Sequence, residues 1–349
     1  MSSSPATTLS SPDPLVVVHH WDTDGVASAL ILREERGKEP LFFPPSPGRY
    51  NLTASQREEL SSLSPREILL ADMNLSQEEY LFLQRTARGN FTAYDHHGGY
   101  GAPEGIRLIN PLVSGGEPED SLSTTAVLRR HFSRFEDLLY WLGIWGDTGF
   151  KTPEGSERSV ALDRFLAKEG RARSEFLRLV ALLDLPYRTG RREMVLQLME
   201  RVRAIDLWEL PGEEFLLRLE DEIEEALRKA EASALQEGPF QAVFFSGKPL
   251  ISSQLCRTLY ARNPDRLSLV VHDRGEDLQF YLRTRKGPFA ELIGKAKGMG
   301  LSAGGKGDVI GAVLKLEEVK GFITLWENLF LKPLGIELPW ELKRRIPYL

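Results

Sequence analysis

The sequence has almost no cysteine and no long apolar stretch. Cys256 is the single cysteine among 349 residues, which excludes an intrachain disulfide and a zinc site built from cysteine thiolates. No apolar run approaches the roughly 20 residues that a membrane-spanning helix needs. We therefore expect a cytoplasmic protein with no membrane association.

An excess of positive charge is also missing, because the formal net charge is −6. This balance argues against a broad basic face that coats nucleic acid, although a local basic groove remains compatible with it. The only obvious cluster of basic and aromatic residues is Trp340 with Lys343, Arg344 and Arg345, and we interpret it as part of a terminal helix.

The composition predicts a folded core large enough for two domains. Hydrophobic residues make up 42% of the chain, and 349 residues suit two domains of roughly 100–200 residues each. Residues 1–14 are rich in Ser, Thr and Pro, and they have neither a basic n-region nor an apolar h-region. We expect them to form a disordered tail and not a signal peptide.

Short apolar runs alternate with helical patterns over residues 15–155. The predicted strands are Leu15–His20, Leu41–Phe43, Ile68–Asp72 and Phe91–Asp95. A helix is predicted over Gly25–Glu35, a capping box over residues 76–79 predicts a second helix to about Ala87, and Ser123 begins a third through His131. This βαβ alternation predicts a mostly parallel sheet covered on both faces.

The second half of the chain changes character twice. Residues 156–238 lack strand signals, and an apolar stripe at helical spacing predicts a long amphipathic connector helix. The stripe comprises Leu216, Leu219, Ile223, Leu227, Ala230 and Ala234. Residues 239–349 return to an α/β pattern. Its predicted elements are strands Gln241–Ser246, Leu267–Asp273 and Gln279–Arg283 and helices near Ser252–Arg262 and Glu317–Leu331. The predicted class is α/β, with a mostly parallel N-terminal sheet domain, a helical connector and a smaller C-terminal α/β domain.

Two histidine doublets, which hold four of the six histidines, stand beside aspartates at the ends of apolar runs. In the first, His20, Asp22 and Asp24 are spaced by two, so they share one side of the chain while it stays extended. Gly25 then allows the backbone to turn into a helix. Carboxylate oxygens mixed with imidazole nitrogens suit divalent ions such as Mn²⁺, Mg²⁺ or Zn²⁺.

The second doublet is Asp95-His96-His97, where two adjacent imidazoles project differently and can take different roles. Asp72 closes another apolar run, and Asp147 lies in a comparable position. Because ligands gather beyond the carboxyl ends of parallel strands, we expect these strand-end acids to converge. The sequence therefore predicts a two-metal hydrolase.

Together these segments resemble the motifs of the DHH phosphoesterases. His20-x-Asp22-x-Asp24-Gly25 is similar to the first motif and Asp72 to the second, Asp95-His96-His97 is the third, and Gly146-Asp147-Thr148-Gly149 is similar to the fourth. The resemblance covers about residues 14–150. The family includes RecJ-type exonucleases, nanoRNases, cyclic-dinucleotide phosphodiesterases and family II pyrophosphatases.

The resemblance implies two divalent ions, with Mn²⁺ expected and Mg²⁺ as the alternative. One ion would be bound by His20, Asp22 and Asp72. The second would be bound by Asp24, Asp72, His96 and Asp147, with Asp72 as the bridge. Asp95 would orient an imidazole, and His97 would lie near the scissile phosphate. The choice between His19 and His20 as the metal ligand stays open, with His20 favoured.

A glycine-rich segment over residues 298–308 is expected to form a loop that offers backbone N–H groups to an anion. It resembles the Gly-Gly-His signature of the DHHA1 domain, except that Lys306 stands where the family has histidine. Lysine keeps a charge that binds phosphate but has no imidazole acceptor. The residues expected to bind substrate are Arg283, Gly304, Gly305, Lys306 and Gly307.

These expectations favour a two-metal phosphodiesterase or exonuclease that acts on short single-stranded oligonucleotides or on single-stranded DNA or RNA ends. The alternatives are a pyrophosphatase or polyphosphatase, a cyclic-dinucleotide phosphodiesterase, and a non-catalytic scaffold that binds replication or repair partners. A homodimer, or a protein partner bound through residues 156–238, is a further expectation.

Overall fold

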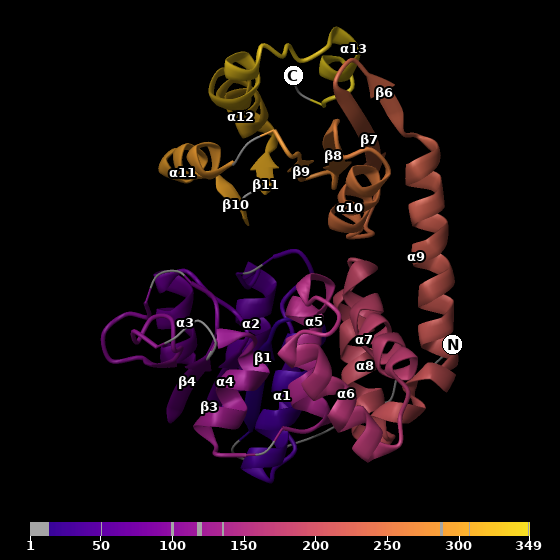
Figure 1. Cartoon of the computed structure of the whole chain (residues 1–349). Helices are drawn as coiled ribbons and strands as arrows, with labels where there is room; N and C mark the ends of the chain where they lie inside the picture. The colour runs from indigo at the N-terminus through magenta and orange to yellow at the C-terminus, as the bar shows by residue number, and fades with distance from the viewer. Residues whose placement is uncertain are drawn as a thin grey trace, which may run out of the picture. The chain divides into compact units, whose positions relative to one another are not determined.

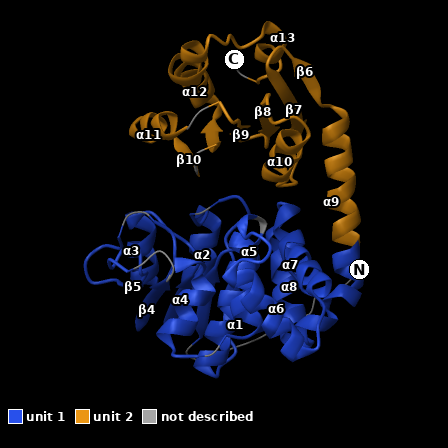
Figure 2. Cartoon of the chain, in the orientation of Figure 1, with its two compact units in different colours: residues 1–217 blue, residues 218–349 orange. Residues whose placement is uncertain are grey.

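This computed structural model divides into two compact units, residues 1–217 and 218–349 (Figures 1 and 2). The structure describes residues 14–49, 51–98, 101–116, 121–134, 136–286, 289–306, 308–347 and 349, and only the backbone of residues 150 and 306. The predicted tail lies outside the described residues, apart from Pro14. The finer partition into domains over 15–155 and 239–349, with a helical segment over 156–238, stays a prediction.

The first unit contains a parallel five-stranded sheet, as the sequence predicts. Its order is β2-β1-β3-β4-β5, and every neighbouring pair is parallel. The strands are β1 (Leu15–His19), β2 (Leu41–Phe43), β3 (Glu67–Ala71), β4 (Asn90–Tyr94) and β5 (Arg107–Ile109). The edge strand β5 was not predicted, because three residues beginning with an exposed arginine show no periodicity.

Helices bury both faces of this sheet, which explains the continuous apolar runs of its strands. Val16 and Val18 of β1 pack in one core with Leu60 of α2 (Ala54–Ser62) and Leu83 of α3 (Gln77–Thr86). Val17 points to the opposite face and is buried as well. On that side α1 (Thr23–Arg36) contacts β1 and β3, and it packs against α4 (Thr124–His131) and α5 (Leu138–Thr148).

The predicted capping box of α3 is only half formed. Ser76 Oγ accepts a hydrogen bond from Glu79 N at 3.3 Å, as expected of the N-cap residue. The Glu79 carboxylate accepts instead from Arg57 Nη2 at 2.7 Å. A complete box forms at α2, where Thr53 and Gln56 exchange hydrogen bonds. A partly buried ion pair with α2 therefore replaces the second half of the local motif.

Helices fill the rest of the first unit and lead into the second. They are α6 (Glu157–Glu169), α7 (Arg173–Arg188), α8 (Arg192–Ala204) and α9 (Glu214–Ala232). Helix α7 contacts α1 and α5. Leu216, Leu219, Ile223 and Ala230 of the predicted stripe are buried along α9, which ends before Ala234.

The second unit has a mixed six-stranded sheet in the order β10-β11-β9-β8-β7-β6. Its strands are β6 (Leu235–Glu237), β7 (Phe240–Ser246), β8 (Leu267–Asp273), β9 (Asp277–Arg283), β10 (Ser302–Lys306) and β11 (Val309–Lys315). Only β7 and β8 form a parallel pair. Helix α10 (Ser252–Arg262), which has the predicted bounds, contacts β8 and β9.

The glycine-rich segment differs from the expected loop. Helix α11 (Ala290–Gly298) runs into its start, and Ser302–Lys306 forms the edge strand β10. Gly304 lies opposite Gly311 of β11 in the antiparallel ladder. A Cβ at Gly305, whose φ is 156°, would lie 2.1 Å from the Val309 carbonyl oxygen, so close strand pairing requires a glycine there. Gly307 lies outside the described residues.

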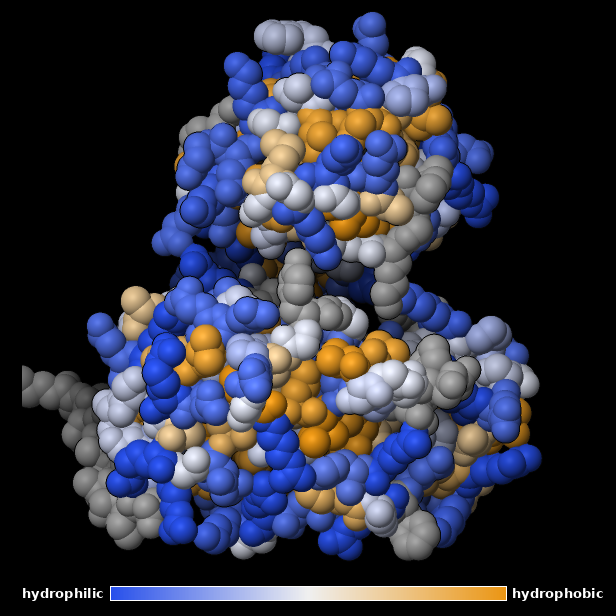
Figure 3. Space-filling model, turned by 90° about the vertical axis from the view of Figure 1, so that its left-hand side faces the viewer, coloured by the Kyte–Doolittle hydropathy of each residue, from blue (hydrophilic) through white to orange (hydrophobic). Residues whose placement is uncertain are grey.

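Hydrophilic residues cover much of the surface in Figure 3, with apolar patches between them. Among the described residues, no helix combines the length and apolar character needed to cross a membrane.

Candidate metal centre

The predicted acids and histidines of the first unit converge at the carboxyl edge of its sheet. Because β1 lies between β2 and β3, the chain leaves β1 to one side and later returns on the other, so the ends of β1 and β3 form the topological switch point at which open α/β sheets bind ligands. His20 follows β1, Asp72 follows β3, and Asp95 follows β4. Neighbouring parallel strands thus bring these three side chains to one edge of the sheet.

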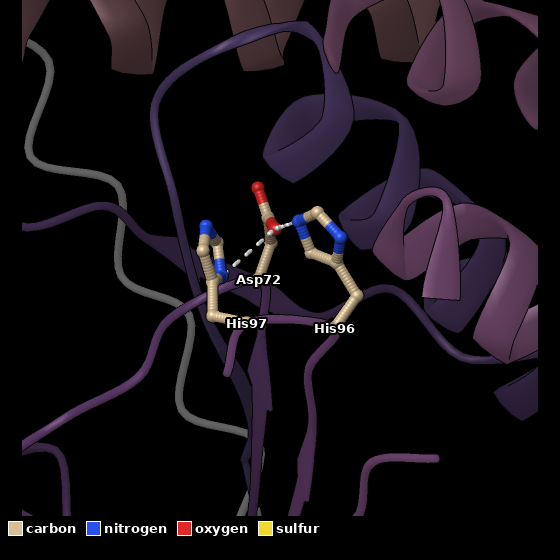
Figure 4. Close-up of side chains that lie close together, drawn as sticks. All are labelled: Asp72, His96 and His97. Carbon is tan, nitrogen blue, oxygen red and sulfur yellow. Dashed lines mark ion pairs between the residues drawn. The ribbon is translucent and has the colours of Figure 1, made fainter. Parts of the chain in front are cut away.

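Asp72 occupies the middle of this cluster in an unusual backbone conformation. Its φ of 64° lies in the left-handed region, which is unfavourable for residues other than glycine. Its amide donates to the Tyr94 carbonyl at 2.9 Å, and its carboxylate Oδ1 accepts from Thr124 Oγ1 at 2.9 Å. Figure 4 shows this carboxylate beside the rings of His96 and His97, with Oδ1 3.4 Å from His96 Nε2. Such strain is typical of functional positions.

His20 and Asp22 form a first group of potential ligands with Asp72. His20 Nδ1 lies 2.9 Å from Asp22 Oδ1 and 3.7 Å from Asp72 Oδ2. The expected extended chain through Asp24 is wrong, because Asp22 is the N-cap of α1 and accepts from Gly25 N at 3.0 Å. Gly25 is required because a Cβ there would lie 2.3 Å from the His20 carbonyl oxygen, and not because the backbone needs its conformational freedom to turn.

Asp24, His96 and Asp147 form a second group. His96 Nε2 lies 3.0 Å from Asp147 Oδ2 and 4.0 Å from Asp24 Oδ2. Asp147 lies in the last turn of α5, so the expectation that it ends a strand is wrong. The apolar run before it is a helix, and α5 brings Asp147 to the cluster by packing against α1.

Backbone amides at the start of α4 hold the Asp24 carboxylate. Thr124 N donates to its Oδ2 at 2.6 Å, and Thr125 N donates to its Oδ1 at 3.1 Å. A helix N-terminus favours negative charge, which stabilises this buried acid. A Cβ at Gly143 of α5 would lie 2.2 Å from Asp24 Oδ1, so α5 can pack there only through a glycine.

Asp95 and His97 form a hydrogen-bonded pair next to Asp72. His97 Nδ1 donates to Asp95 Oδ1 at 2.8 Å, and the Asp95 carboxylate also accepts from Asn110 at 3.2 Å and from Asn74 at 3.4 Å. Asp95 is buried, whereas the His97 side chain is 45% exposed. The hydrogen bond fixes Nδ1 as the protonated atom and leaves Nε2 for contact with solvent or a ligand.

His19 is directed elsewhere. Its Nδ1 donates to the His20 carbonyl at 2.6 Å, and its ring contacts the Phe42 ring edge-on. Burial lowers the pKa of His19 to about 4, so the ring is neutral. The structure therefore brings His20, and not His19, to the carboxylates.

The cluster carries more negative charge than its own cations balance. Burial, followed by the charges of Asp24 and Asp22, raises the pKa of Asp72 well above its usual value. Burial and the charge of Asp147 raise the pKa of Asp24 to about 6. Burial lowers the pKa of His96, but its contacts with Asp147 and Asp24 outweigh this effect and raise it to about 9.

These groups fit divalent metal ions. His20, Asp22 and Asp72 place one ligand atom each within 4.8 Å of one another, and so do Asp24, His96 and Asp147. Asp72 also forms such a group with His96 and His97. Carboxylate oxygens with one imidazole each are donors suited to Mn²⁺ or Mg²⁺.

The second unit places Arg283 beside aromatic and basic residues that the sequence did not reveal. The Arg283 guanidinium lies 5.6 Å from the centre of the Tyr260 ring, and that of Arg285 lies 5.9 Å from it. In the sheet, Arg283 is opposite Val309, which is opposite Lys306. The side chain of Lys306 and the whole of Gly307 lie outside the described residues. Because Tyr260 and Arg283 are distant in sequence, the cluster becomes evident only from the packing of α10 against β9.

The sequence patterns did not predict several residues that shape the site. The sequence pattern marks only Ser123 at this helix start, yet the amides of Thr124 and Thr125 and the hydroxyl of Thr124 hold two of the acids. Asn110 was not considered, yet it fixes Asp95 and also donates to the His97 carbonyl at 2.9 Å. Gly143 gave no signal because its importance depends on a neighbouring helix.

Solved structures share this fold. Exonuclease RecJ bound to manganese aligns with a TM-score of 0.60 and 16% identity over 92% of each chain. The DHH domain of a member of the s1p family of ribosomal proteins aligns with a TM-score of 0.60 and 12% identity, over 93% of this chain and 88% of that one. The chain has the DHH fold.

A third protein with the DHH fold, an exopolyphosphatase-related protein from Bacteroides fragilis, aligns with a TM-score of 0.53 and 14% identity over 92% of this chain and 93% of that one. No family model and no curated protein matches the sequence. The likeness to a DHH fold therefore rests on the structure, and the motif resemblance agrees with it.

Replacing Asp72 separates its backbone strain from its carboxylate. We expect metal-free Asp72→Gly to be more stable than Asp72→Ala by about 1–2 kcal/mol, because glycine adopts the left-handed conformation without a Cβ clash. Both variants should lose most bound Mn²⁺. Urea unfolding and metal analysis measure the two effects. Equal stability of the variants, or full Mn²⁺ occupancy in either, would contradict this account.

Mn²⁺ binding should release protons at pH 7. In the metal-free protein the raised pKa values of Asp72 and His96 keep protons on the cluster, and a metal ion must displace them. Mn²⁺ affinity should therefore rise as the pH increases from 6 towards 9, the pKa of His96 being raised to about 9. Calorimetry in buffers of different ionisation enthalpy counts the released protons. An affinity that does not change over this range is the opposing result.

Proposed function

We propose that this protein is a metal-dependent phosphoesterase that hydrolyses phosphodiester bonds in short single-stranded oligonucleotides or at single-stranded ends. The observation that carries the proposal is the sharing of Asp72. Its two oxygens face both groups of ligands, with Oδ2 3.7 Å from His20 Nδ1 and Oδ1 3.4 Å from His96 Nε2. A carboxylate in this position suits a bridge between two ions.

The proposed ligand sets follow from these contacts. One ion is assigned to His20, Asp22 and Asp72, and the other to Asp24, Asp72, His96 and Asp147. Two ions bound by these residues would supply an activated water and would neutralise the charge that develops on the phosphoryl group. A scaffold that only binds partners would have no use for so many buried carboxylates, whose mutual repulsion disfavours the metal-free state.

We assign proton transfer to His97. Water attack at phosphorus breaks the bond to the leaving oxygen, which then takes a proton. Asp95 accepts from His97 Nδ1 at 2.8 Å, so the ring is oriented with Nε2 available to a substrate. Asn110 and Asn74 hold Asp95 in turn. Asp95 also stabilises the protonated imidazole, which is the form that donates to the leaving oxygen.

The second unit supports an oligonucleotide over a compact phosphate compound. Tyr260 with Arg283 and Arg285 combines an aromatic face with two cations, the pairing by which proteins bind the bases and backbone of single strands. The fold likeness to an exonuclease agrees with this choice. We include Gly304, Gly305 and Lys306 in the proposed substrate surface because their backbones pair with β11. Gly307, which lies outside the described residues, is included only because of the motif resemblance.

A polyphosphatase or pyrophosphatase is the second candidate. The specific observation in its favour is the shared fold of an exopolyphosphatase-related protein. The same metal centre would serve either reaction, because each one displaces an oxygen at phosphorus. The two functions differ in what they require of the second unit, since pyrophosphate has no base for Tyr260 to contact.

A substrate panel with Mn²⁺ tests the proposed function. End-labelled RNA and DNA oligonucleotides of several lengths, pyrophosphate, polyphosphate and a cyclic dinucleotide are compared under one condition. We expect short single strands to be hydrolysed fastest, and Tyr260→Ala to raise KM for them. If only pyrophosphate or polyphosphate is hydrolysed, the protein is a pyrophosphatase or polyphosphatase and not a phosphodiesterase. A manganese-loaded protein that hydrolyses no member of the panel would refute a phosphoesterase.

Substituting the two histidines of the second doublet separates binding from catalysis. His96→Ala should lower Mn²⁺ content, because it removes a ligand of one proposed ion. His97→Ala should keep Mn²⁺ content and lower kcat by about 10²- to 10⁴-fold, the usual range for loss of a general acid. Metal analysis and steady-state kinetics on both variants decide the roles, and the reverse pattern would exchange them.

A further inference from the structure

Thr23, which no motif singles out, is held by an acid from a distant helix. The Thr23 hydroxyl donates to Asp184 Oδ1 at 2.7 Å, and its amide donates to the same oxygen at 3.1 Å. Asp184 lies on α7, 161 residues further along the chain. Thr23 is fully buried. The two hydrogen bonds to this carboxylate fix both the backbone and the side chain of Thr23.

Thr23 is the residue through which several ligand-bearing segments meet. It stands between Asp22 and Asp24 in the sequence and is the first residue of α1. It also packs against α5 at Gly146, where an added Cβ would lie 2.9 Å from Thr23 Cβ. The next residue of α5 is Asp147. Thr23 is therefore joined through the backbone to Asp22 and Asp24, and it packs beside the segment that carries Asp147.

The contact is more than an ordinary helix cap. Asp22 already caps α1 by accepting from Gly25 N at 3.0 Å. Asp184 adds a second carboxylate at the same helix end, where the amide of Thr23 offers positive partial charge. Its other oxygen, Oδ2, accepts from Arg188 Nη2 at 3.1 Å. Both oxygens are thus engaged, and Arg188 balances the charge of a largely buried acid.

We propose that Asp184 is a positioning residue that acts through Thr23 to hold the turn carrying His20 and Asp22 in its metal-binding geometry. The inference rests on the proposed metal centre. Its effect should differ between the two ions. Asp24 has independent anchors in the amides of Thr124 and Thr125, whereas Asp22 belongs to the turn that Asp184 holds.

The test uses two single-site backgrounds, so that each ion is measured alone. In His96→Ala the ion of His20 and Asp22 remains, and in His20→Ala the ion of Asp24 and Asp147 remains. Thr23→Val, Thr23→Ser and Asp184→Ala are placed in each background. Mn²⁺ binding is measured by calorimetry and by the Mn²⁺ electron paramagnetic resonance spectrum.

In the His96→Ala background, Thr23→Val and Asp184→Ala should weaken Mn²⁺ binding about 10- to 100-fold, as expected for loss of a contact that orients a ligand. In the His20→Ala background the same changes should leave Mn²⁺ affinity nearly unchanged. Thr23→Ser keeps the hydroxyl and should retain binding in both. Thr23→Val preserves side-chain shape, so it carries the test if Asp184→Ala fails to fold.

Ile31→Val, further along the same helix, is the matched control. It removes a buried methylene and lowers stability without touching the turn. Its Mn²⁺ affinities should match the parent protein. Unchanged or equally reduced affinity at both sites in Thr23→Val would overturn the positioning role alone, provided that each background binds Mn²⁺. If the parent protein binds no Mn²⁺, the proposed function fails, and this inference fails with it.

Discussion

The crowding of buried carboxylates around Asp72 is the constraint on which the rest of the site depends. Asp24, Asp72 and Asp95 are almost completely inaccessible to solvent, and a buried charge is costly unless it is paired. The protein pairs them in three ways. Backbone amides of α4 hold the Asp24 carboxylate. The Asp95 carboxylate is held by His97 and two asparagines. Asp72, whose backbone is left-handed, faces two imidazoles. The remaining charge is what two divalent cations would neutralise.

Close packing of helices makes this crowding achievable. The order β2-β1-β3 places the strand ends side by side, and the acids approach one another because α1, α4 and α5 pack against one another. Gly25, Gly143 and Gly146 each occupy positions where a Cβ would collide with a ligand-bearing segment. Helix α7 adds Asp184 from outside. Local backbone geometry and long-range packing therefore together determine how these acids and histidines are arranged.

The sequence predicts the parallel sheet and the convergence of its strand-end acids because β-branched runs and following aspartates are local signals. It fails where position depends on tertiary contacts. Asp147 reaches the cluster from the last turn of the buried helix α5, whose apolar run periodicity alone does not distinguish from a strand. Asp22 ends the extended chain by capping α1. Asp184 contacts Thr23, and Tyr260 contacts Arg283, although each pair is far apart in sequence. No local sequence pattern therefore predicts these contacts.

We propose that Asp72 bridges two metal ions. Anomalous X-ray scattering at the manganese edge, from crystals of the protein grown with Mn²⁺, tests it most directly. The account predicts two peaks about 3.5–4 Å apart, one beside each oxygen of Asp72. The first should lie near His20 and Asp22, and the second near His96 and Asp147. A single peak, or two peaks that leave Asp72 uncoordinated, would contradict the claim.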